Sequence, residues 1–406
     1  MGTMLVPSIV NAKEAGKKQQ SRWSIIECPV GEPDPVTSYK TLKKAEKVAG
    51  FSFHIPVIKN YRRTEINLLD KEVFEITYKN KKKKVLHLVE AMGGGVFTYL
   101  AELANGMSDE FDVSIAFGMR KETPENYEDY FNEGIKLIKV ENFTRSLNVV
   151  KDIKAYIELR KIVKKEKPDI IHLHSSKAGA LGRLLVGTGK AKMFYTPHGY
   201  SFLMENESGI KQQIYKTMEK ILGKRKCLTV ACGKSEWEQS RIVTKNSTYI
   251  SNGVNIDKLN ANLINANEQN LEDFNIKKNV FTAYTVGRIN YQKWPELFNE
   301  IAQKLPEMQF VWIGDGDMRD KLTADNIVIT GWMEHKEAME LSTKFDAFIL
   351  ASRYEGLPIS LLEAMYMKKA CVVSNVVGNR DVIKNDYNGY ICDETDQFVE
   401  ALKDIE

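Results

Sequence analysis

Short runs of β-branched residues alternate with helical segments from Lys84 to the end of the chain, and this alternation constrains the fold more than any other feature. The segments 148–166 and 295–305, for example, have the length and apolar spacing of helices. Buried parallel strands that are connected by crossover helices form doubly wound α/β domains. The pattern therefore predicts the α/β class with Rossmann-like sheets.

The strand-like runs fall into two series. The first series comprises residues 84–90, 111–117, 135–140, 168–174, 192–198, 227–233 and 247–253. The second comprises residues 281–287, 308–314, 326–331, 345–352 and 370–375. Two series predict two doubly wound domains, which we place at residues 81–253 and 254–406.

The first 80 residues follow a different pattern. Thr41 is a candidate N-cap for a short amphipathic helix over residues 42–49, and Gly50 closes it. The stretch 51–57 and the pair 65–69 and 72–78 are typical of strands, and the pair predicts a hairpin. We therefore predict that residues 1–80 form an extra N-terminal segment with a small α+β module.

The net charge of +4 conceals a basic N-terminal part. Residues 1–84 contain 17 Lys and Arg against 9 Asp and Glu, so the remaining residues carry a net charge of −4. The excess is concentrated in Lys79 and in residues 81–84. A solvated linker is the plainest interpretation, and contact with an anionic membrane surface is the alternative. Nucleic acid is not an expected partner, because no aromatic residues interleave with the basic run.

The composition, 43% hydrophobic and 28% charged, is typical of a globular protein. The longest apolar runs are far shorter than the roughly 20 residues that cross a bilayer as a helix. The five cysteines are an odd number, and no two have the C-x-x-C spacing. We expect buried thiols in a reducing compartment, and therefore a cytoplasmic protein, rather than disulfides or a zinc site.

Glycines and a histidine follow strands of the first series, where ligands of open α/β sheets bind. Gly94 and Gly95 open a helix, so the backbone and the helix amides can approach an anion. The pattern is not G-x-G-x-x-G, which disfavours a dinucleotide cofactor. His198 stands between a proline and a glycine, and we expect it to face the cleft between the domains. His172 and His174 alternate along one strand, and without an apparent third ligand we do not interpret them as metal ligands.

Two cations and two acids follow strands of the second series. Arg288 and Lys293 lie in a loop that leads into a helix, and such a pair can bind a diphosphate and stabilise its departure. Glu355 and Glu363 flank a Gly-Leu-Pro turn, with Pro358 expected in the first helical turn. Carboxylates accept hydrogen bonds from paired sugar hydroxyls, and the plainer interpretation is acids that are favoured by a helix dipole.

These features occur together in an order that resembles the GT-B glycosyltransferases of the large retaining family 4. The matching features are Gly93 to Gly95, the "TPHG" histidine, "NGV" at 252–254, "GRINYQK", "IGDGDMRDKL", "TGW" and "EGLPISLLEAM". The last contains the family's E-x7-E signature. The resemblance covers residues 84 to about 400 and implies an acceptor domain followed by a nucleotide-sugar donor domain.

The resemblance also implies roles for single residues. Arg288 and Lys293 would bind the donor diphosphate, while Glu355 would contact the transferred sugar and Glu363 the ribose. The remaining positions would be Gly356 and Leu357 at the sugar, Gly331, Trp332 and Met333 at the nucleobase, Gly94 and Gly95 at the phosphates, and His198 near the attacking hydroxyl.

The implied reaction retains the anomeric configuration by front-face substitution, and a phosphate oxygen takes the acceptor proton. No metal or other cofactor is expected, since the nucleotide sugar is itself a substrate. Asp315 and Asp317 spell D-x-D, but they lie in a "GDGD" turn after a strand, and we interpret them as structural.

The stretches "HLHSSKAGALGR" and "TPHGYSF" resemble members that build bacterial surface polysaccharides. Such enzymes extend glycans on undecaprenyl diphosphate at the inner face of the plasma membrane, with UDP-sugars as the usual donors. Ser175, Ser176 and Lys177 are our candidates for acceptor contacts. The lysine-rich helix 148–166 is plainly interpreted as a solvated cover of the sheet, and peripheral membrane binding is its alternative.

Two alternatives remain open at this point. One is a UDP-sugar 2-epimerase of the same fold, and the other is a non-catalytic protein that binds sugar nucleotides or the cell envelope. Members of the family usually continue with helices that return to the first domain, whereas this chain ends soon after the segment 396–406. On that ground we expect looser closure between the domains.

Overall fold

The computed structural model describes residues 61–68, 71–78, 82–90, 92–120, 123–144, 148–187, 189–204, 208–264 and 271–406. The chain divides into two compact units, Met1–Lys82 and Lys83–Glu406. Among the described residues, none of the helices combines the length and the apolarity that crossing a membrane requires.

The first unit contains a two-stranded antiparallel hairpin. Strand β1 (Tyr61–Leu68) pairs with β2 (Lys71–Tyr78) along the whole length of both strands. The predicted hairpin is thus confirmed, with a first strand that begins earlier than the sequence suggested. The predicted helix 42–49 and the predicted strand 51–57 lie outside the described residues.

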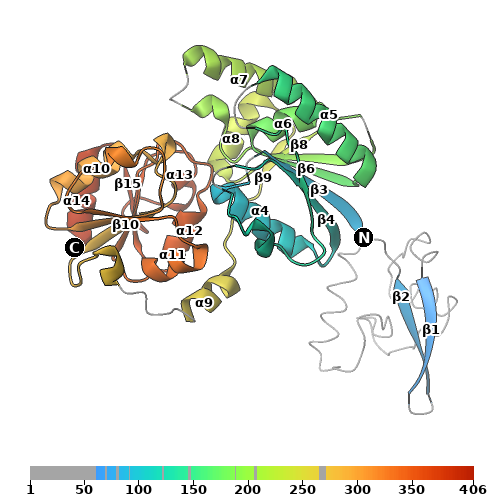
Figure 1. The fold of residues 1–406 in the computed structure, drawn as a ribbon, viewed down its shortest axis with the longest axis horizontal. Helices are drawn as coiled ribbons and strands as arrows, with labels where there is room; N and C mark the ends of the chain where they lie inside the picture. The colour runs from blue at the N-terminus through green and yellow to red at the C-terminus, as the bar shows by residue number, and fades with distance from the viewer. Residues whose placement is uncertain are drawn as a thin grey trace. The chain divides into compact units, whose positions relative to one another are not determined.

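A seven-stranded parallel sheet opens the second unit (Figure 1). Its order is β5-β4-β3-β6-β7-β8-β9. The strands are β3 (Lys83–Val89), β4 (Phe111–Phe117), β5 (Lys136–Lys139), β6 (Ile170–His174), β7 (Lys192–Thr196), β8 (Leu228–Ala231) and β9 (Ser247–Tyr249). All seven predicted strands are present, and the winding direction reverses between β3 and β6, where ligands of such sheets bind.

Five helices connect these strands. They are α4 (Gly94–Met107), α5 (Val149–Glu166), α6 (Ser176–Arg183), α7 (Gly209–Leu222) and α8 (Lys234–Val243). Helix α5 begins where the Asn148 side chain accepts a hydrogen bond from the Lys151 amide, and it ends at Lys167 in the left-handed conformation. The sequence prediction for this helix is therefore confirmed almost to the residue.

The second sheet is also parallel and has the order β12-β11-β10-β13-β14-β15. Its strands are β10 (Thr282–Val286), β11 (Gln309–Ile313), β12 (Ile327–Gly331), β13 (Ala347–Leu350), β14 (Ala370–Ser374) and β15 (Tyr390–Cys392). The accompanying helices are α9 (Ile256–Ile264), α10 (Pro295–Lys304), α11 (His335–Ser342), α12 (Ile359–Tyr366), α13 (Asn379–Val382) and α14 (Thr395–Ile405). Of the strands of this sheet, β15 was not predicted from the sequence, and neither were the helices α9, α11 and α13.

The two faces of the first sheet differ in chemistry. Leu86, Leu88 and Leu173 pack with α5 and α6 in one apolar cluster. Burying each such leucine contributes roughly 1.5–3 kcal/mol. Because side chains alternate along a strand, His87 and His174 lie on the opposite face, which α4 covers, and both are fully buried. The face under α4 therefore contains buried histidines beside an apolar cluster.

Candidate functional site

A largely buried charge pair lies in the loops after β10 and β13, where the winding direction of the second sheet reverses. Lys293 Nζ is 2.7 Å from Glu355 Oε1, and Gln292 Nε2 donates to Glu355 Oε2 at 3.2 Å. Glu355 is only 6% exposed. The predicted cation and the predicted acid are thus brought together, and each compensates the charge that burial would otherwise make costly.

Arg288 occupies the same loop as Lys293 but has a different acidic partner. Its Nη2 lies 3.2 Å from Asp317 Oδ1. Asp315 accepts a hydrogen bond from the Gly316 amide at 2.8 Å and pairs with Arg319 at 3.1 Å. Both aspartates of the D-x-D sequence therefore have partners inside or beside their own turn.

Glu363 lies in the middle of α12 and has a partner that the sequence did not suggest. His335 Nε2, at the start of α11, is 2.7 Å from Glu363 Oε1. His335 follows two residues after the predicted nucleobase segment, in which Gly331 has φ +82° and Trp332 is 60% exposed. Met333 is packed against the neighbouring apolar cluster. Pro358 precedes α12 as its N-cap residue, so the expectation of a place in the first turn is wrong by one position.

Gly94 and Gly95 begin α4 and leave space in front of that helix. A Cβ atom built at either position would have no heavy atom within 4 Å, and Gly94 has φ +59°. The amides at the start of this 14-residue helix can therefore be approached closely by an anion.

His198 has the left-handed φ of +54°, and both nitrogens of its ring are already engaged. Nε2 is 3.1 Å from His174 Nδ1, and Nδ1 is 3.4 Å from Cys232 Sγ. Burial lowers the pKa of His198 to about 3, with His172 as a lesser cause. In this arrangement the ring supports the loop, and it would have to break a contact before it could accept a substrate proton.

The loops of the two sheets meet at Gly356. A Cβ atom on Gly356 would lie 3.3 Å from the Gly199 nitrogen and 3.6 Å from Glu236 Oε1. Asn252 Nδ2 donates to the Leu357 carbonyl at 2.8 Å. The predicted donor residues Gly356 and Leu357 thus lie against the loop that carries His198.

Glu236 holds this meeting point from the first turn of α8, and sequence reasoning missed it. Its two oxygens accept hydrogen bonds from the Gly199 amide at 2.6 Å and from the Cys232 amide at 2.7 Å. Burial raises the pKa of Glu236, whereas its hydrogen bonds with the Cys232 and Gly199 amides oppose that rise. The sequence does place Glu236 just after a predicted strand, in the first turn of the helix that follows it, and this position could have indicated its role.

The three candidate acceptor residues have separate surroundings. Ser175 donates to Glu90, which also pairs with Arg120 at 2.6 Å. Ser176 Oγ accepts from the Ser201 amide at 3.4 Å, and Lys177 Nζ is 2.6 Å from Asp152 of α5. Ser175 thus joins a polar cluster with Glu90 and Arg120 at the ends of β3 and β4, and the Lys177 contact leads to a different element.

A cavity of about 310 Å³ lies between α4 and the helices of the second sheet. Glu363 and His335 line it from one side, and Tyr99 and Glu102 line it from α4. Residues of both sheets therefore enclose a space next to the predicted ribose carboxylate.

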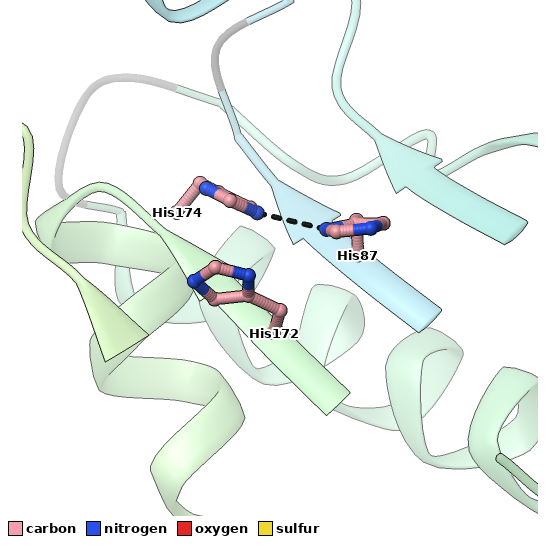
Figure 2. A group of neighbouring side chains, drawn as sticks. All are labelled: His87, His172 and His174. Carbon is pink, nitrogen blue, oxygen red and sulfur yellow. Dashed lines mark hydrogen bonds between the residues drawn. The ribbon is translucent and has the colours of Figure 1, made fainter. Parts of the chain in front are cut away.

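A third histidine joins His172 and His174, so the reasoning that no third ligand accompanies them is wrong. His87 on β3 pairs in register with His172 on β6, and one ring nitrogen of each of the three histidines lies within 4.8 Å of the others. Figure 2 shows His87 and His174 facing each other, with His172 beside them. The contact was missed because His87 and His172 are 85 positions apart in the sequence, and only the pairing of their strands brings the rings together.

Two family models match the chain in succession. Residues 93–258 match Glycosyltransferase Family 4, and residues 266–406 match Glycosyl transferases group 1. The resemblance that the sequence motifs indicated is thereby confirmed.

Two related enzymes act on lipid-linked saccharides according to their names. The chain is 30% identical to the UDP-Gal:alpha-D-GlcNAc-diphosphoundecaprenol alpha-1,3-galactosyltransferase of Escherichia coli, over 80% of this chain and 88% of that one. It is 23% identical to the N,N'-diacetylbacillosaminyl-diphospho-undecaprenol alpha-1,3-N-acetylgalactosaminyltransferase of Campylobacter jejuni, over 73% of this chain and 82% of that one.

Solved structures share the fold. Sucrose-phosphate synthase from Thermosynechococcus elongatus superimposes with a TM-score of 0.67 at 15% identity, covering 80% of this chain and 90% of that one. The Anabaena protein HepE in complex with UDP and glucose gives a TM-score of 0.64 at 15% identity, covering 79% and 89%. The chain therefore belongs to the family 4 glycosyltransferases, has the GT-B fold, and is a glycosyltransferase whose second half is a group 1 domain.

Proposed function

We propose that this enzyme moves a hexose from a UDP-sugar to a saccharide on undecaprenyl diphosphate, with retention, during synthesis of a bacterial surface polysaccharide. The pair formed by Lys293 and Glu355 is the observation that carries the proposal, because it combines a diphosphate-binding cation with a sugar-binding acid. The name of the Escherichia coli relative supports a UDP donor and a lipid-diphosphate acceptor.

Binding of the donor would rearrange the Lys293 contacts. The diphosphate competes with Glu355 for the ammonium group, and Arg288 adds the second positive charge. Once released, the Glu355 carboxylate can accept hydrogen bonds from hydroxyls of the transferred sugar. The amides of Gly356 and Leu357 are proposed to complete that contact.

The nucleoside end is proposed to lie by Glu363. Its carboxylate would exchange the contact with His335, now 2.7 Å away, for the ribose hydroxyls. The segment from Gly331 to Met333 would lie along the base, and Gly94 and Gly95 would let the amides of α4 reach the phosphates.

In the proposed reaction the acceptor oxygen forms a bond to the anomeric carbon on the face from which the UDP oxygen departs. The acceptor hydroxyl proton passes to an oxygen of the leaving diphosphate, so UDP leaves with the pair of electrons from the broken bond. Arg288 and Lys293 stabilise the charge that develops on the diphosphate. We propose that these two cations make a metal ion unnecessary.

A substrate screen tests the reaction. The purified enzyme is incubated with a panel of UDP-sugars, with and without a short undecaprenyl-diphosphate saccharide, and UDP and glycan products are measured. Acceptor-dependent UDP release with a longer glycan supports the proposal, and the anomeric proton coupling of the product tests retention. An isomerised donor would instead indicate the epimerase, and binding without turnover the non-catalytic alternative.

Two helices of the first domain support a location at the inner face of the plasma membrane. The outer faces of α5 and α7 carry exposed aliphatic side chains, at Val149, Val150, Ile153, Ile157, Ile210, Ile214, Met218 and Ile221. Helix α6 contacts both helices. Lysines accompany the aliphatic residues along α5 and α7. We propose that this aliphatic and basic surface binds an anionic bilayer.

Vesicle binding tests the membrane surface. Replacing Ile210 and Ile214 together with Glu removes apolar area and adds negative charge, so co-sedimentation with phosphatidylglycerol vesicles should fall about tenfold or more. Ile242→Glu on α8 is the matched control, because Ile242 is also exposed but lies on another helix. Equal binding by both variants would contradict the assignment of the surface.

A further inference from the structure

A row of hydrogen-bonded rings connects the centre of the first sheet with the loop that carries His198. His87 Nδ1 is 3.0 Å from His174 Nε2, and His174 Nδ1 is 3.1 Å from His198 Nε2. The row ends at Cys232, whose Sγ is 3.4 Å from His198 Nδ1. We name these four residues the imidazole chain. His172 lies beside His87 and His174 (Figure 2). Its Nε2 is 2.9 Å from Thr196 Oγ1.

The geometry of these rings favours hydrogen bonds over metal binding. The facing ring nitrogens are 3.0 Å apart between His87 and His174 and 3.1 Å apart between His174 and His198. At these distances one nitrogen donates a hydrogen bond to the other. The group of His87, His172 and His174 contains only neutral ligands, and two of its members are fully buried. Both ring nitrogens of His174 are already in hydrogen bonds, with His87 and with His198, so a metal ion bound to this group would have to break one of them.

The protons along the imidazole chain can be counted. Burial is the main cause that lowers the pKa of His87, His174 and His198, so each ring is neutral at physiological pH and carries one N–H. A contact between two ring nitrogens needs one donor and one acceptor. The position of a single proton therefore fixes the positions of all the others, and only two arrangements of the chain are possible.

The thiol end selects between these arrangements. Burial is the main cause that raises the pKa of the Cys232 thiol, and the Glu236 carboxylate adds to it through its charge and a side-chain hydrogen bond, whereas hydrogen bonds with the His198 amide and the Asn252 side chain oppose it. A carboxylate can only accept, so the S–H proton is directed to Glu236. The sulfur must then accept from His198 Nδ1–H, and His198 Nε2 must accept from His174 Nδ1–H.

The far end agrees with this direction. If His174 Nε2 accepts, His87 must donate through Nδ1, which leaves His87 Nε2 as an acceptor. That buried atom has no hydrogen-bond partner among the described residues. An unpaired buried acceptor is tolerated better than an unpaired buried N–H group, so the arrangement with every ring protonated at Nδ1 is favoured.

The imidazole chain supports a strained turn at the site. His198 and Gly199 have successive positive φ angles of +54° and +88°. A residue other than glycine in this conformation costs roughly 1–2 kcal/mol, so surrounding contacts must hold His198 there. The ring contacts of His198 and the hydrogen bond from the Gly199 amide to Glu236 supply them. The same Gly199 amide faces Gly356, in the loop that follows Glu355.

We propose that Cys232, Glu236 and His174 are positioning residues of the transferase: they hold His198 as the Nδ1–H tautomer and thereby fix the His198–Gly199 turn against the Gly356 loop. The inference rests on the proposed function only where it takes the Gly356 loop to contact the donor sugar. The tautomers themselves do not depend on which donor is used.

Ring nitrogen NMR of the wild-type enzyme tests the tautomers directly. Two-bond proton–nitrogen spectra of ¹⁵N-histidine-labelled protein, assigned with single His→Asn variants, should show Nδ1–H for His87, His174 and His198 at pH 7.5. A His198 ring that is protonated at Nε2, or one that is cationic, would overturn the proposal whatever the activity of the enzyme.

Two substitutions of Cys232 test the positioning. A serine hydroxyl can both donate to Glu236 and accept from His198, so Cys232→Ser should keep kcat within about threefold and preserve the His198 tautomer. Cys232→Ala removes the acceptor, and its kcat should fall about tenfold, with the donor KM little changed and a mixed tautomer spectrum. Equal kcat values for the two variants, at matched thermal stability, would overturn the positioning role. Donor hydrolysis is the readout if no acceptor is used.

Discussion

The two halves of residues 83–406 contribute opposite chemistry to the site. The first sheet supplies uncharged rings, since burial holds the pKa of His87 and His174 well below the usual value. The second sheet supplies ion pairs, with Lys293 bound to Glu355 and Arg288 bound to Asp317. An anionic donor needs cations near its diphosphate, and their effect is larger beside a surface of low polarity. The comparison indicates that the cations expected to bind the donor lie in the second half, whereas the first half contributes neutral rings and a separate ion pair between Arg120 and Glu90.

Removing a charge from the second half should have the largest effect. Lys293→Ala is expected to lower kcat/KM by about 10²–10³-fold, the usual loss when a group that stabilises developing charge is removed. The measurement is initial-rate kinetics at saturating acceptor. Lys304→Ala is the control, because Lys304 pairs with Asp396 on the surface, and its rates should stay close to wild type. A similarly active Lys293→Ala variant would contradict the division of roles.

Glu363, the carboxylate proposed to bind the ribose, should be less critical. Glu363→Gln keeps the shape but removes the negative charge, so the donor KM should rise about tenfold while kcat changes little. Isothermal titration with UDP gives the same comparison without turnover. Glu300→Gln, on the exposed face of α10, should bind UDP as the wild type does. Unchanged affinity in Glu363→Gln would remove that carboxylate from the nucleoside site.

The histidines of the first half should affect how the free energy of unfolding depends on pH. Burial lowers the pKa of His172 to about 4 and that of His198 to about 3. In the unfolded chain both rings titrate near 6.5, so below that pH the unfolded state binds more protons and the free energy of unfolding falls. Each ring contributes up to about 1.4 kcal/mol per pH unit between about pH 6 and 4.

Urea unfolding at pH 7.5, 6 and 5 measures this dependence. The free energy of unfolding should be highest at pH 7.5 and should decline toward pH 5. In His172→Asn the free energy of unfolding should fall less steeply with decreasing pH, because the substituted side chain no longer takes up a proton when the protein unfolds. The difference in slope should correspond to at most one proton. An identical slope in the variant would show that His172 binds a proton equally well in both states.

Glycines at the start of α4 should show the smallest effects. Ala at Gly94 must adopt a positive φ, which costs about 1 kcal/mol, whereas Ala at Gly95 lies in open space and should leave stability unchanged or slightly improved. Gly95→Ala should still raise the donor KM a few-fold if the phosphates approach there. Gly106→Ala, in the same helix with equally open surroundings, should improve stability without changing KM.

Most of the architecture could be predicted because it depends on local patterns. Every strand of the first sheet and five of the second lie in short strand-like runs that alternate with helical segments, and the candidate site residues follow several of these strands. The proximity of Lys293 and Glu355 follows from that rule alone, since both loops leave the sheet at its point of reversal. The three residues of β15 form no pattern of their own and depend on pairing with β14.

The contacts that were missed depend on pairing between distant segments. His87 meets His174 only because β3 and β6 are neighbours, and His335 meets Glu363 because the start of α11 comes within hydrogen-bonding distance of α12. Sequence reasoning found His198 but expected its ring to be available in the cleft. The structure places both ring nitrogens in internal hydrogen bonds, a property that no spacing along the chain encodes.

Asp381 connects the two halves of residues 83–406. Its carboxylate accepts hydrogen bonds from the Ser235 amide and hydroxyl at the start of α8, so an acid of the second half caps a helix of the first. The two halves are therefore joined by a side chain of the protein itself. We expect Asp381→Ala to loosen this contact, so release of the bound nucleotide should be faster and its binding weaker wherever release requires the halves to separate.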